Sequence, residues 1–204
     1  MSNIHSPTTN DVTTFPLAST IDTCSIWFML ASHTLTRAAK AKNLNFIVSG
    51  FVRYESLESY HPAPGTPQHR MQDIFRSLLE KGDQFSQHEL NVNDLREVAR
   101  LNGIKHLGKG ELTSIVLAMK MRLGFMTDDK GGKKLARSLS HQIEVRTTPL
   151  LLGWLVYTGA MGDSEASNAI KEHDAVHGSN GLKSYLQNCY DSGMHYRLIQ
   201  PVNA

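Results

Sequence analysis

Long hydrophobic runs are missing from this chain of 204 residues. Its longest nearly apolar stretch, residues 149–162, is interrupted by glycine and is too short to span a bilayer. The opening sequence MSNIHSPTTNDVTT is polar and lacks the basic start and apolar run of a secretory signal. We therefore expect a cytoplasmic protein with no membrane partner.

Cysteine is scarce, and histidine shows no metal-binding pattern. The two cysteines, Cys24 and Cys189, lie outside any CxxC pattern, so free thiols are expected in a reducing compartment, with one disulfide as the alternative. The ten histidines include no HExxH or HxH spacing, which argues against a zinc site. Neither sign of charge dominates, since the formal net charge is +2. Attraction to nucleic acid must then come from local basic patches.

The length and the ordinary composition, 40% hydrophobic and 20% charged, predict one well-buried domain with an elaboration. Residues 1–15, rich in Ser, Thr and Asn, are expected to be a flexible lead-in. Residues 16–160 are expected to form the main domain. Residues 161–204 carry two helical patterns and are expected to be a C-terminal helical extension packed on that domain.

Short apolar segments alternate with helical ones along the main domain. Strands are expected at residues 15–21, 45–49, 123–127 and 144–145. Helices are expected at residues 24–40, 52–60, 71–81, 95–101, 111–122, 131–139 and 149–157. Residues 61–68, with three prolines and a glycine, are expected to form a loop, and a polar linker follows residue 81. This alternation predicts an α/β fold with a parallel sheet covered on both faces.

Acidic residues recur where an apolar strand ends or a helix begins. They are Asp22, Glu55, Glu111, Asp128 and Asp129. Because the carboxyl ends of parallel strands meet at one edge of a sheet, we expect these side chains to converge. Such a group repels itself unless cations neutralise it. Oxygen-only ligands suit Mg²⁺ or Mn²⁺, and hydrolysis of a phosphodiester by a metal-activated water is the chemistry that this site predicts.

Each acid also has an ordinary structural interpretation. Asp22 is well placed to cap the helix that follows it. Glu55 alone is compatible with a solvated helix position, and Glu111 with a charge that complements the helix dipole. Asp128 and Asp129 precede a helix that either could cap. Because all of these acids lie at a strand end or a helix start, a shared site is favoured over separate structural roles.

The sequence LGKGELTSIVLAMKMRLGFMTDDK, which begins at Leu107, resembles the LGxGExxAIxLAxxxG…LxTDDxxAR signature of PIN-domain (VapC-like) metal-dependent nucleases. STIDTCSIWFML resembles the opening strand and DTSxL turn of that family, and FIVSGFVRYESL resembles its strand and xxxYE segment. VRTTPLLLGWLVYTG resembles the closing GTxGLLxxAxxxG helix. The resemblance runs from about Ser19 to Gly159, which is most of the chain.

The resemblance implies a three-layer α/β/α PIN-like fold with a central parallel sheet and a Mg²⁺- or Mn²⁺-dependent endoribonuclease site. The catalytic and metal-binding residues that it implies are Asp22, Glu55, Glu111 and Asp128, with Asp129 as an accessory or alternative. Thr23 or Ser25, matching the hydroxyl after the first Asp of the family, would orient a carboxylate or a metal-bound water. Cleavage by water would leave a 5′-phosphate and a 3′-hydroxyl.

The partners that the resemblance implies are an RNA substrate, an antitoxin or other protein partner, and a second copy of the chain in a homodimer. Many members are toxins of toxin–antitoxin pairs, and others act in RNA processing or defence. The chain departs from the family in its 61–68 loop, in Arg146-Thr147-Thr148 and in its C-terminal extension. These departures leave the substrate and the partner open.

Basic residues flank the acids, and their side chains could hold phosphates on either side of the scissile bond. They are Lys105, His106, Lys109, Lys130, Lys133, Lys134 and Arg137. A solvated helix face is the alternative for those after Asp129.

Two other functions stay open: a catalytically silent PIN-fold binding or scaffold module in RNA processing, and a phosphatase or phosphotransferase with Asp22 as nucleophile. The second is disfavoured because DTCS lacks a DxD pair.

Overall fold

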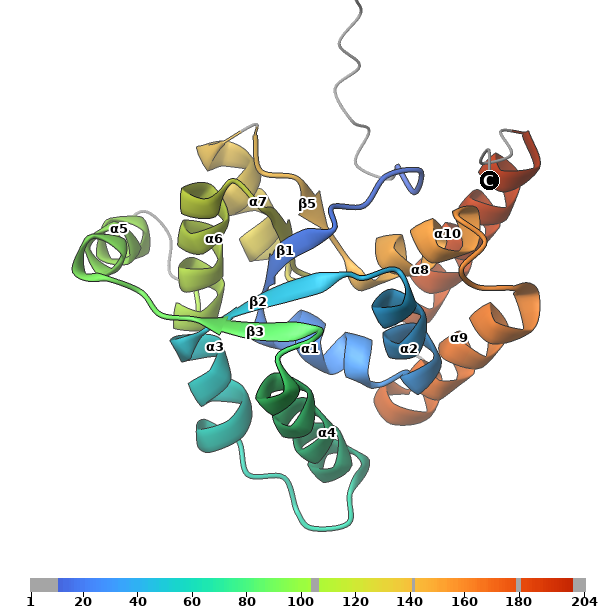
Figure 1. The fold of residues 1–204 in the computed structure, drawn as a ribbon, viewed down its shortest axis with the longest axis horizontal. Helices are drawn as coiled ribbons and strands as arrows, with labels where there is room; N and C mark the ends of the chain where they lie inside the picture. Colours follow the sequence, from blue (N-terminus) through green and yellow to red (C-terminus); the bar gives the residue numbers. More distant parts are fainter. Residues whose placement is uncertain (1–10, 104–106, 141, 179–180, 200–204) are drawn as a thin grey trace, which may run out of the picture.

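Five parallel strands form a central sheet in the computed structural model, which describes residues 11–103, 107–140, 142–178 and 181–199. The strand order across the sheet is β3-β2-β1-β4-β5 (Figure 1). The strands are β1 (Ala18–Ile21), β2 (Asn45–Ser49), β3 (Phe85–His88), β4 (Gly124–Met126) and β5 (Val145–Arg146). Helices flank both faces of the sheet, so the predicted α/β fold with three layers is confirmed.

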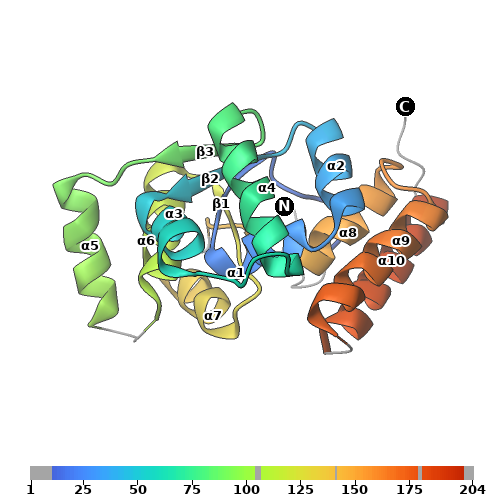
Figure 2. The same ribbon diagram turned by 90° about the horizontal axis from the view of Figure 1, so that it is seen from below.

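Figure 2 shows the layers on either side of the sheet. One side carries α5 (Val92–Asn102), α6 (Lys109–Met121) and α7 (Lys130–Leu139). The other carries α1 (Thr23–Leu30), α2 (His33–Ala41), α4 (Pro67–Lys81) and α8 (Thr148–Tyr157), with α9 (Asp163–His177) and α10 (Gly181–Ile199) outside them. The short helix α3 (Gly50–Tyr54) follows β2 and contacts α6.

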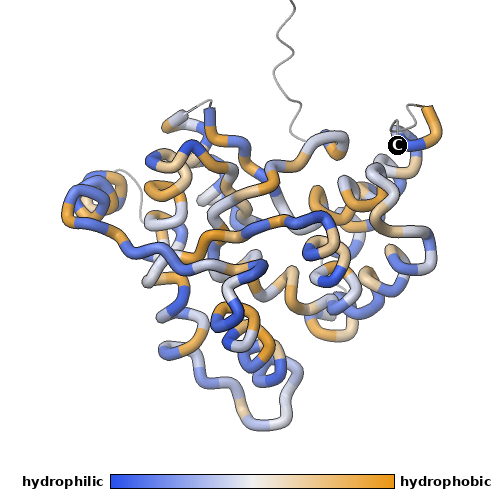
Figure 3. Tube along the Cα trace, viewed as in Figure 1, coloured by the Kyte–Doolittle hydropathy of each residue, from blue (hydrophilic) through white to orange (hydrophobic). Residues whose placement is uncertain are grey.

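Side chains that alternate along the strands fill two separate cores, one on each face of the sheet. Ile21, Phe46 and Phe85 belong to the larger core, under α1, α2, α4 and α8. Phe125 and Val145 belong to the smaller core, with α6 and α7. Figure 3 shows the hydrophobic segments along the strands at the centre of the molecule, whereas the outlying α5 is largely hydrophilic. Burial of both sheet faces explains why β4 lacks polar residues and why the three central residues of β2 are apolar.

Small hydroxyl residues hold α6 against the sheet. The Thr20 hydroxyl donates to the Ser114 carbonyl at 2.9 Å, and the Ser114 hydroxyl donates to the Ile21 carbonyl at 3.0 Å. Ser49 and Thr113 join their hydroxyls at 2.8 Å. These side chains are short, so α6 approaches the strands closely. The first turn of α6 is thereby fixed beside the ends of β1 and β2.

The helix expected at residues 24–40 is two helices, α1 and α2. The Ser32 hydroxyl accepts from Leu35 N–H at 3.0 Å and caps α2, which ends α1 before it. The Ser32 hydroxyl also donates to Glu172 of α9 at 2.7 Å. The break therefore depends on a residue 140 positions away, which local sequence patterns do not reveal.

The polar linker expected after residue 81 contains β3, a strand that the sequence analysis missed. β3 lies at the edge of the sheet and pairs only with β2 among the described strands. Its sequence FSQH carries one apolar residue, Phe85, which is fully buried. An edge strand with a single buried position lacks the alternation that identifies strands.

The helix expected at residues 52–60 changes its winding. α3 ends at Tyr54 and passes into a π-helical turn, η1 (Glu55–Ser59). The Gln72 side-chain amide donates to the Ser56 carbonyl at 2.9 Å and to the Tyr60 carbonyl at 2.8 Å, which satisfies carbonyls at this turn. The expected 61–68 loop is shorter than predicted, because α4 begins at Pro67.

Part of the expected lead-in, residues 1–15, packs on the domain. Val12 is fully buried and Phe15 nearly so, and the Arg146 guanidinium donates to the Asp11 carbonyl at 2.7 Å. Residues 11–15 are therefore anchored by packing, in contrast to the predicted flexibility, while residues 1–10 lie outside the described residues. At the other end of the chain, α10 packs against α8.

Over the described part of the chain, no helix is both long enough and apolar enough to cross a bilayer. Cys24 and Cys189 are free thiols, the first partly buried and the second buried.

Candidate functional site

Asp22 follows β1 directly and is fully buried. Its Oδ1 accepts from Ser25 N–H at 2.8 Å, so it caps α1 as an ordinary N-cap does. Its Oδ2 accepts from the Thr127 hydroxyl at the end of β4. β1 and β4 are neighbours in the sheet, and this is why two residues far apart in sequence meet here.

Asp128 lies after β4 and is held by two helices of the other layer. Its Oδ2 accepts from the Ser25 hydroxyl at 2.9 Å and from the Thr148 hydroxyl at 2.6 Å. Thr148 N–H also donates to Oδ1 at 3.1 Å. Ser25 thus contacts Asp22 through its backbone and Asp128 through its side chain, so one residue of α1 positions both carboxylates.

Glu55 begins the π-helical turn and points toward α1 and α6. Its Oε2 accepts from the Thr23 hydroxyl at 2.7 Å, and its Oε1 accepts from Gly110 N–H at 3.0 Å. A Cβ at position 110 would overlap the Glu55 carboxylate and would lie 3.2 Å from the Thr23 hydroxyl. Gly110 therefore leaves the space that Glu55 occupies. π-helical turns of this kind are frequent at functional sites.

Glu111 and Asp129 meet beside Gly132. Glu111 Oε2 accepts from Gly108 N–H at 2.9 Å at the start of α6, and Asp129 Oδ2 accepts from Gly132 N–H at 2.8 Å at the start of α7. A Cβ at position 132 would lie 3.5 Å from Glu111 Oε1 and 3.2 Å from the Thr127 hydroxyl. Both acids therefore complement a helix N-terminus, and they also face each other.

The surroundings of Asp22 oppose its ionisation. Burial raises the pKa of Asp22 to about 7; hydrogen bonds from Thr127 and Ser25 oppose this rise, and the charge of Asp128 adds to it. The carboxyl group therefore keeps its proton to a much higher pH than an ordinary aspartate, and it would give up that proton to bind a cation.

Two further acids have pKa values above their usual range. Burial raises the pKa of Glu111; the Gly108 N–H opposes the rise, while Asp129 and Glu55 add to it. Burial likewise raises the pKa of Asp128, against hydrogen bonds that lower it. Carboxylates that raise one another's pKa values in this way form a region in which positive charge would be favourable.

Cys24 shows that the acids converge. Burial and, after it, the charges of four neighbouring carboxylates together raise the pKa of its thiol to about 12. In order of their effect they are Asp22, Asp128, Asp129 and Glu111. These residues follow β1, follow β4 and begin α6, so the carboxyl edge of the sheet gathers acids from separate segments.

The predicted basic residues are more dispersed. Lys133 lies close enough for its charge to lower the pKa of Asp128, and the Lys109 ammonium lies 5.9 Å from the centre of the Phe51 ring. Burial raises the pKa of Tyr185 on α10, and the charge of the nearby Arg137 opposes this rise. Lys130 and Lys134 are exposed on α7. The predicted Lys105 and His106 lie outside the described residues.

The donor set fits Mg²⁺ or Mn²⁺ in its chemistry, since the converging side chains offer only carboxylate and hydroxyl oxygens. Within the described ranges, no three His, Cys, Asp or Glu side chains stand close enough together to hold one ion as they are placed. The hydrogen bonds explain this spacing, because each carboxylate accepts from a backbone N–H or hydroxyl of its own. Binding an ion would require the carboxylates to exchange some of these partners for the cation.

Thr127, Thr148 and Gly110 also belong to the site, although the sequence motifs do not predict them. Thr127 precedes the double aspartate directly, and this adjacency is a signal that the sequence does contain. Thr148 belongs to the departure at residues 146–148, and its hydroxyl reaches Asp128 from the start of α8. Arg146 plays no part in the site, because its guanidinium pairs with Glu144 and with the Asp11 carbonyl.

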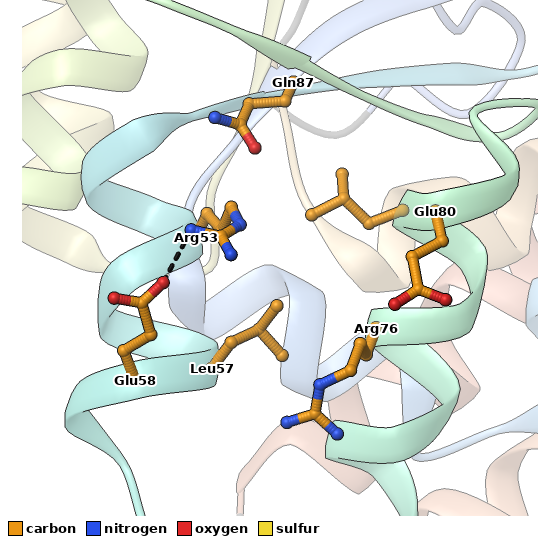
Figure 4. A pocket seen from close by; sticks show the side chains of 7 residues that line it. Arg53, Leu57, Glu58, Arg76, Glu80 and Gln87 are labelled. Atoms are coloured by element: carbon orange, nitrogen blue, oxygen red, sulfur yellow. Dashed lines mark hydrogen bonds and ion pairs between the residues drawn. The ribbon is translucent and has the colours of Figure 1, made fainter.

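A separate hollow of about 320 Å³ lies between α3 and α4 (Figure 4). Arg53 of α3 points into it and pairs with Glu58 at 2.6 Å. The lining residues are Arg53, Leu57, Glu58, Arg76, Leu79, Glu80 and Gln87. Arg53 and Glu55, two positions apart, point to opposite sides of the helix, so the hollow lies away from the carboxylates.

No protein-family model, no curated protein and no solved structure matches this chain. The functional interpretation therefore depends on the geometry of the carboxylates and on the motifs that surround them.

Proposed function

We propose that the chain is a Mg²⁺- or Mn²⁺-dependent endoribonuclease of the PIN type. One observation carries the proposal: acids from separate segments gather at the carboxyl edge of a parallel sheet, where α/β proteins place their working groups. The motifs that resemble those of PIN-domain nucleases contain all of these acids. Buried carboxylates with raised pKa values, close to like charges, are typical of functional sites.

Asp22, Glu55, Glu111 and Asp128 would hold the cation, with Asp129 as an accessory ligand. A bound divalent ion would supply a Lewis acid and lower the pKa of a coordinated water. Thr23 and Ser25 position Glu55 and Asp128 through hydrogen bonds of 2.7 Å and 2.9 Å. Thr127 and Thr148 do the same for Asp22 and Asp128. Hydroxyls that orient ligands commonly support metal affinity.

The substrate would be RNA, held through its phosphates by basic side chains around the acids. Lys133, whose charge acts on Asp128, and Lys109 at the start of α6 are the best placed. The exposed residues Lys130, Lys134 and Arg137 of α7 would extend this surface. A role as the toxin of a toxin–antitoxin or defence system, in the cytoplasm, with an antitoxin and a homodimer as protein partners, is the biological context that we propose.

The experiment that tests the proposal is incubation of the purified chain with RNA, with Mg²⁺ or Mn²⁺ and with EDTA in parallel. Cleavage that requires the metal and leaves 5′-phosphate and 3′-hydroxyl ends is expected. Asp22→Asn and Glu111→Gln should abolish it. Asp83→Asn is the matched control, since Asp83 is a half-exposed acid that pairs with Lys40 far from the site. Wild-type protein that cuts no RNA under any of these conditions would contradict the proposal.

The alternative is a catalytically silent binding or scaffold module of the same fold. The hydrogen bonds that already occupy each carboxylate, and the lack of three grouped ligands in the described residues, favour it. Calorimetric titration with Mn²⁺ distinguishes the two functions. A silent module should bind RNA without binding Mn²⁺. The nuclease should bind Mn²⁺, and its Asp22→Asn variant should not.

A further inference from the structure

Two aromatic side chains lie on α3 next to Glu55. Tyr54 is 53% exposed, although the ring of a tyrosine has a large apolar surface, and Phe51 is only partly buried. Residues three apart on a helix are neighbours, so Phe51 and Tyr54 lie on the same side of α3. Phe51 is also one turn before Glu55. The three side chains consequently share about a third of the circumference of the helix.

The Lys109 ammonium completes this surface. It lies 5.9 Å from the centre of the Phe51 ring, and the next residue, Gly110, donates its N–H to Glu55. A cation, an aromatic face and a carboxylate of the candidate site are thus adjacent. Aromatic rings of proteins stack on nucleobases, and ammonium groups attract phosphates by charge.

Hydrogen bonds hold the backbone of α3 and of the turn that follows it. The Ser49 hydroxyl caps α3 by accepting from Val52 N–H at 3.2 Å, and Gln72 of α4 holds the carbonyls of Ser56 and Tyr60 beyond it. Arg53 points away, into the hollow between α3 and α4 (Figure 4). The backbone that carries the two aromatic residues is therefore held in place beside Glu55.

We propose that Phe51 and Tyr54 form a stacking surface for unpaired bases of a single-stranded RNA whose phosphates lie at Lys109 and whose scissile bond lies at the carboxylates. This inference rests on the proposed function and specifies its substrate class. Bases within a duplex are already stacked and paired, so they cannot reach these rings. Stacking on an aromatic side chain strengthens binding by about 5- to 150-fold per base.

The test is binding of fluorescent oligonucleotides to full-length protein that carries Asp22→Asn, so that bound RNA is not cut. A short oligouridine, an abasic strand with the same phosphates and a duplex of the same length separate stacking from charge. Oligouridine should bind at least about 5-fold more tightly than either of the others. Tyr54→Ala and Phe51→Leu should remove this preference without weakening abasic binding, while Tyr54→Phe should keep it. Tyr196→Ala, at a 39% exposed tyrosine on α10, should change nothing.

Equal binding of oligouridine and the abasic strand would overturn the inference. So would a Tyr54→Ala variant that binds oligouridine as tightly as before, or one whose affinity for oligouridine and for the abasic strand falls equally. If the wild-type protein cuts RNA and these results are obtained, only the stacking surface fails. If it neither binds nor cuts any strand, the proposed function itself fails.

Discussion

Thr23 and Glu55, 32 residues apart, are joined by a 2.7 Å hydrogen bond from hydroxyl to carboxylate. Thr23 opens the helix after β1, and Glu55 opens the π-helical turn beyond β2. Because β1 and β2 are parallel neighbours, the segments that follow them leave the same edge of the sheet. The bond therefore links two of the acidic segments and fixes the direction of the Glu55 carboxylate.

Gly110→Ala should displace Glu55. Replacing glycine by alanine in a helix ordinarily stabilises a protein by up to about 1 kcal/mol. Here the added Cβ would overlap the Glu55 carboxylate, so we expect Mn²⁺ affinity and RNA cleavage to fall about 10-fold or more. Gly162→Ala is the control, because its added Cβ meets no atom within 4 Å. Unchanged Mn²⁺ affinity in Gly110→Ala, measured by calorimetry, would show that Glu55 is no ligand.

Thr148→Val should loosen Asp128 while keeping the shape of the side chain. The change removes the 2.6 Å hydrogen bond that the Thr148 hydroxyl donates to Asp128. This hydrogen bond lowers the pKa of Asp128, so that pKa should rise in the variant. The lost hydrogen bond should lower the free energy of unfolding by about 1–2 kcal/mol. Thr148→Ser restores the donor and should behave as wild type. Carboxyl chemical shifts followed by NMR against pH measure the first effect, and an unchanged Asp128 titration in Thr148→Val would argue against it.

Asp22→Asn should stabilise the metal-free protein. The pKa of Asp22 is about 7 in the folded chain, against an ordinary value of 3.8. The folded chain therefore binds this proton more tightly than the unfolded chain does. The resulting contribution to the free energy of unfolding is fully present below about pH 4 and is lost as the pH rises toward 7. Asparagine carries no charge and can still cap α1. We expect a gain in unfolding free energy on the order of 2 kcal/mol at pH 8 in EDTA, measured by urea denaturation. Asp83→Asn, at an exposed acid, should show no such gain, and a destabilised Asp22→Asn would contradict the electrostatics.

His173 should make the fold sensitive to acid. Its imidazole is 2% exposed, its ring centroid lies 4.6 Å from that of His177, and its Nε2 has no hydrogen-bond partner among the described residues. Burial lowers the pKa of His173 from 6.5 to about 4; His177 adds to this and the charge of Asp174 opposes it. Above pH 6.5 the group is neutral in both states, and between pH 6.5 and 4 only the unfolded chain takes up the proton. Stability should therefore fall as the pH falls through this range.

The loss attributable to His173 should be on the order of 2 kcal/mol. His173→Phe should remove this part of the pH dependence, as measured by urea denaturation between pH 4 and 7. His33→Gln, at an exposed histidine of α2, is the matched control and should keep it. A steep acid dependence that persists in His173→Phe would assign the effect to other groups.

Most strands of the sheet can be predicted from the sequence, but the edge strand β3 cannot. β2 was predicted at its observed bounds, because its three central apolar residues are followed directly by Ser49, which caps α3. β3 was missed because FSQH has a single buried position. The break at Ser32 was missed because its second partner, Glu172, comes from α9. Long-range partners of this kind have no local signature.

The site shows the same division. The acids could be predicted because strand ends and helix starts are visible in sequence, and parallel strands must end at one edge. Thr148 could not be, since its contact with Asp128 depends on how α8 packs against the sheet. The directions of the Glu55, Glu111 and Asp129 carboxylates were equally hidden, because they accept hydrogen bonds from the backbone N–H groups of Gly110, Gly108 and Gly132.

The most direct measurement is titration of metal-free protein with Mn²⁺, followed by electron paramagnetic resonance and calorimetry. If acids remote in the sequence form one basin for a cation, the wild-type protein should bind Mn²⁺, and Asp22→Asn, Glu111→Gln and Asp128→Asn should each lower the affinity by about 10-fold or more. Asp83→Asn should bind as wild type does. Wild-type protein that leaves all of the Mn²⁺ free, or binding that survives all three substitutions, would contradict the existence of that basin.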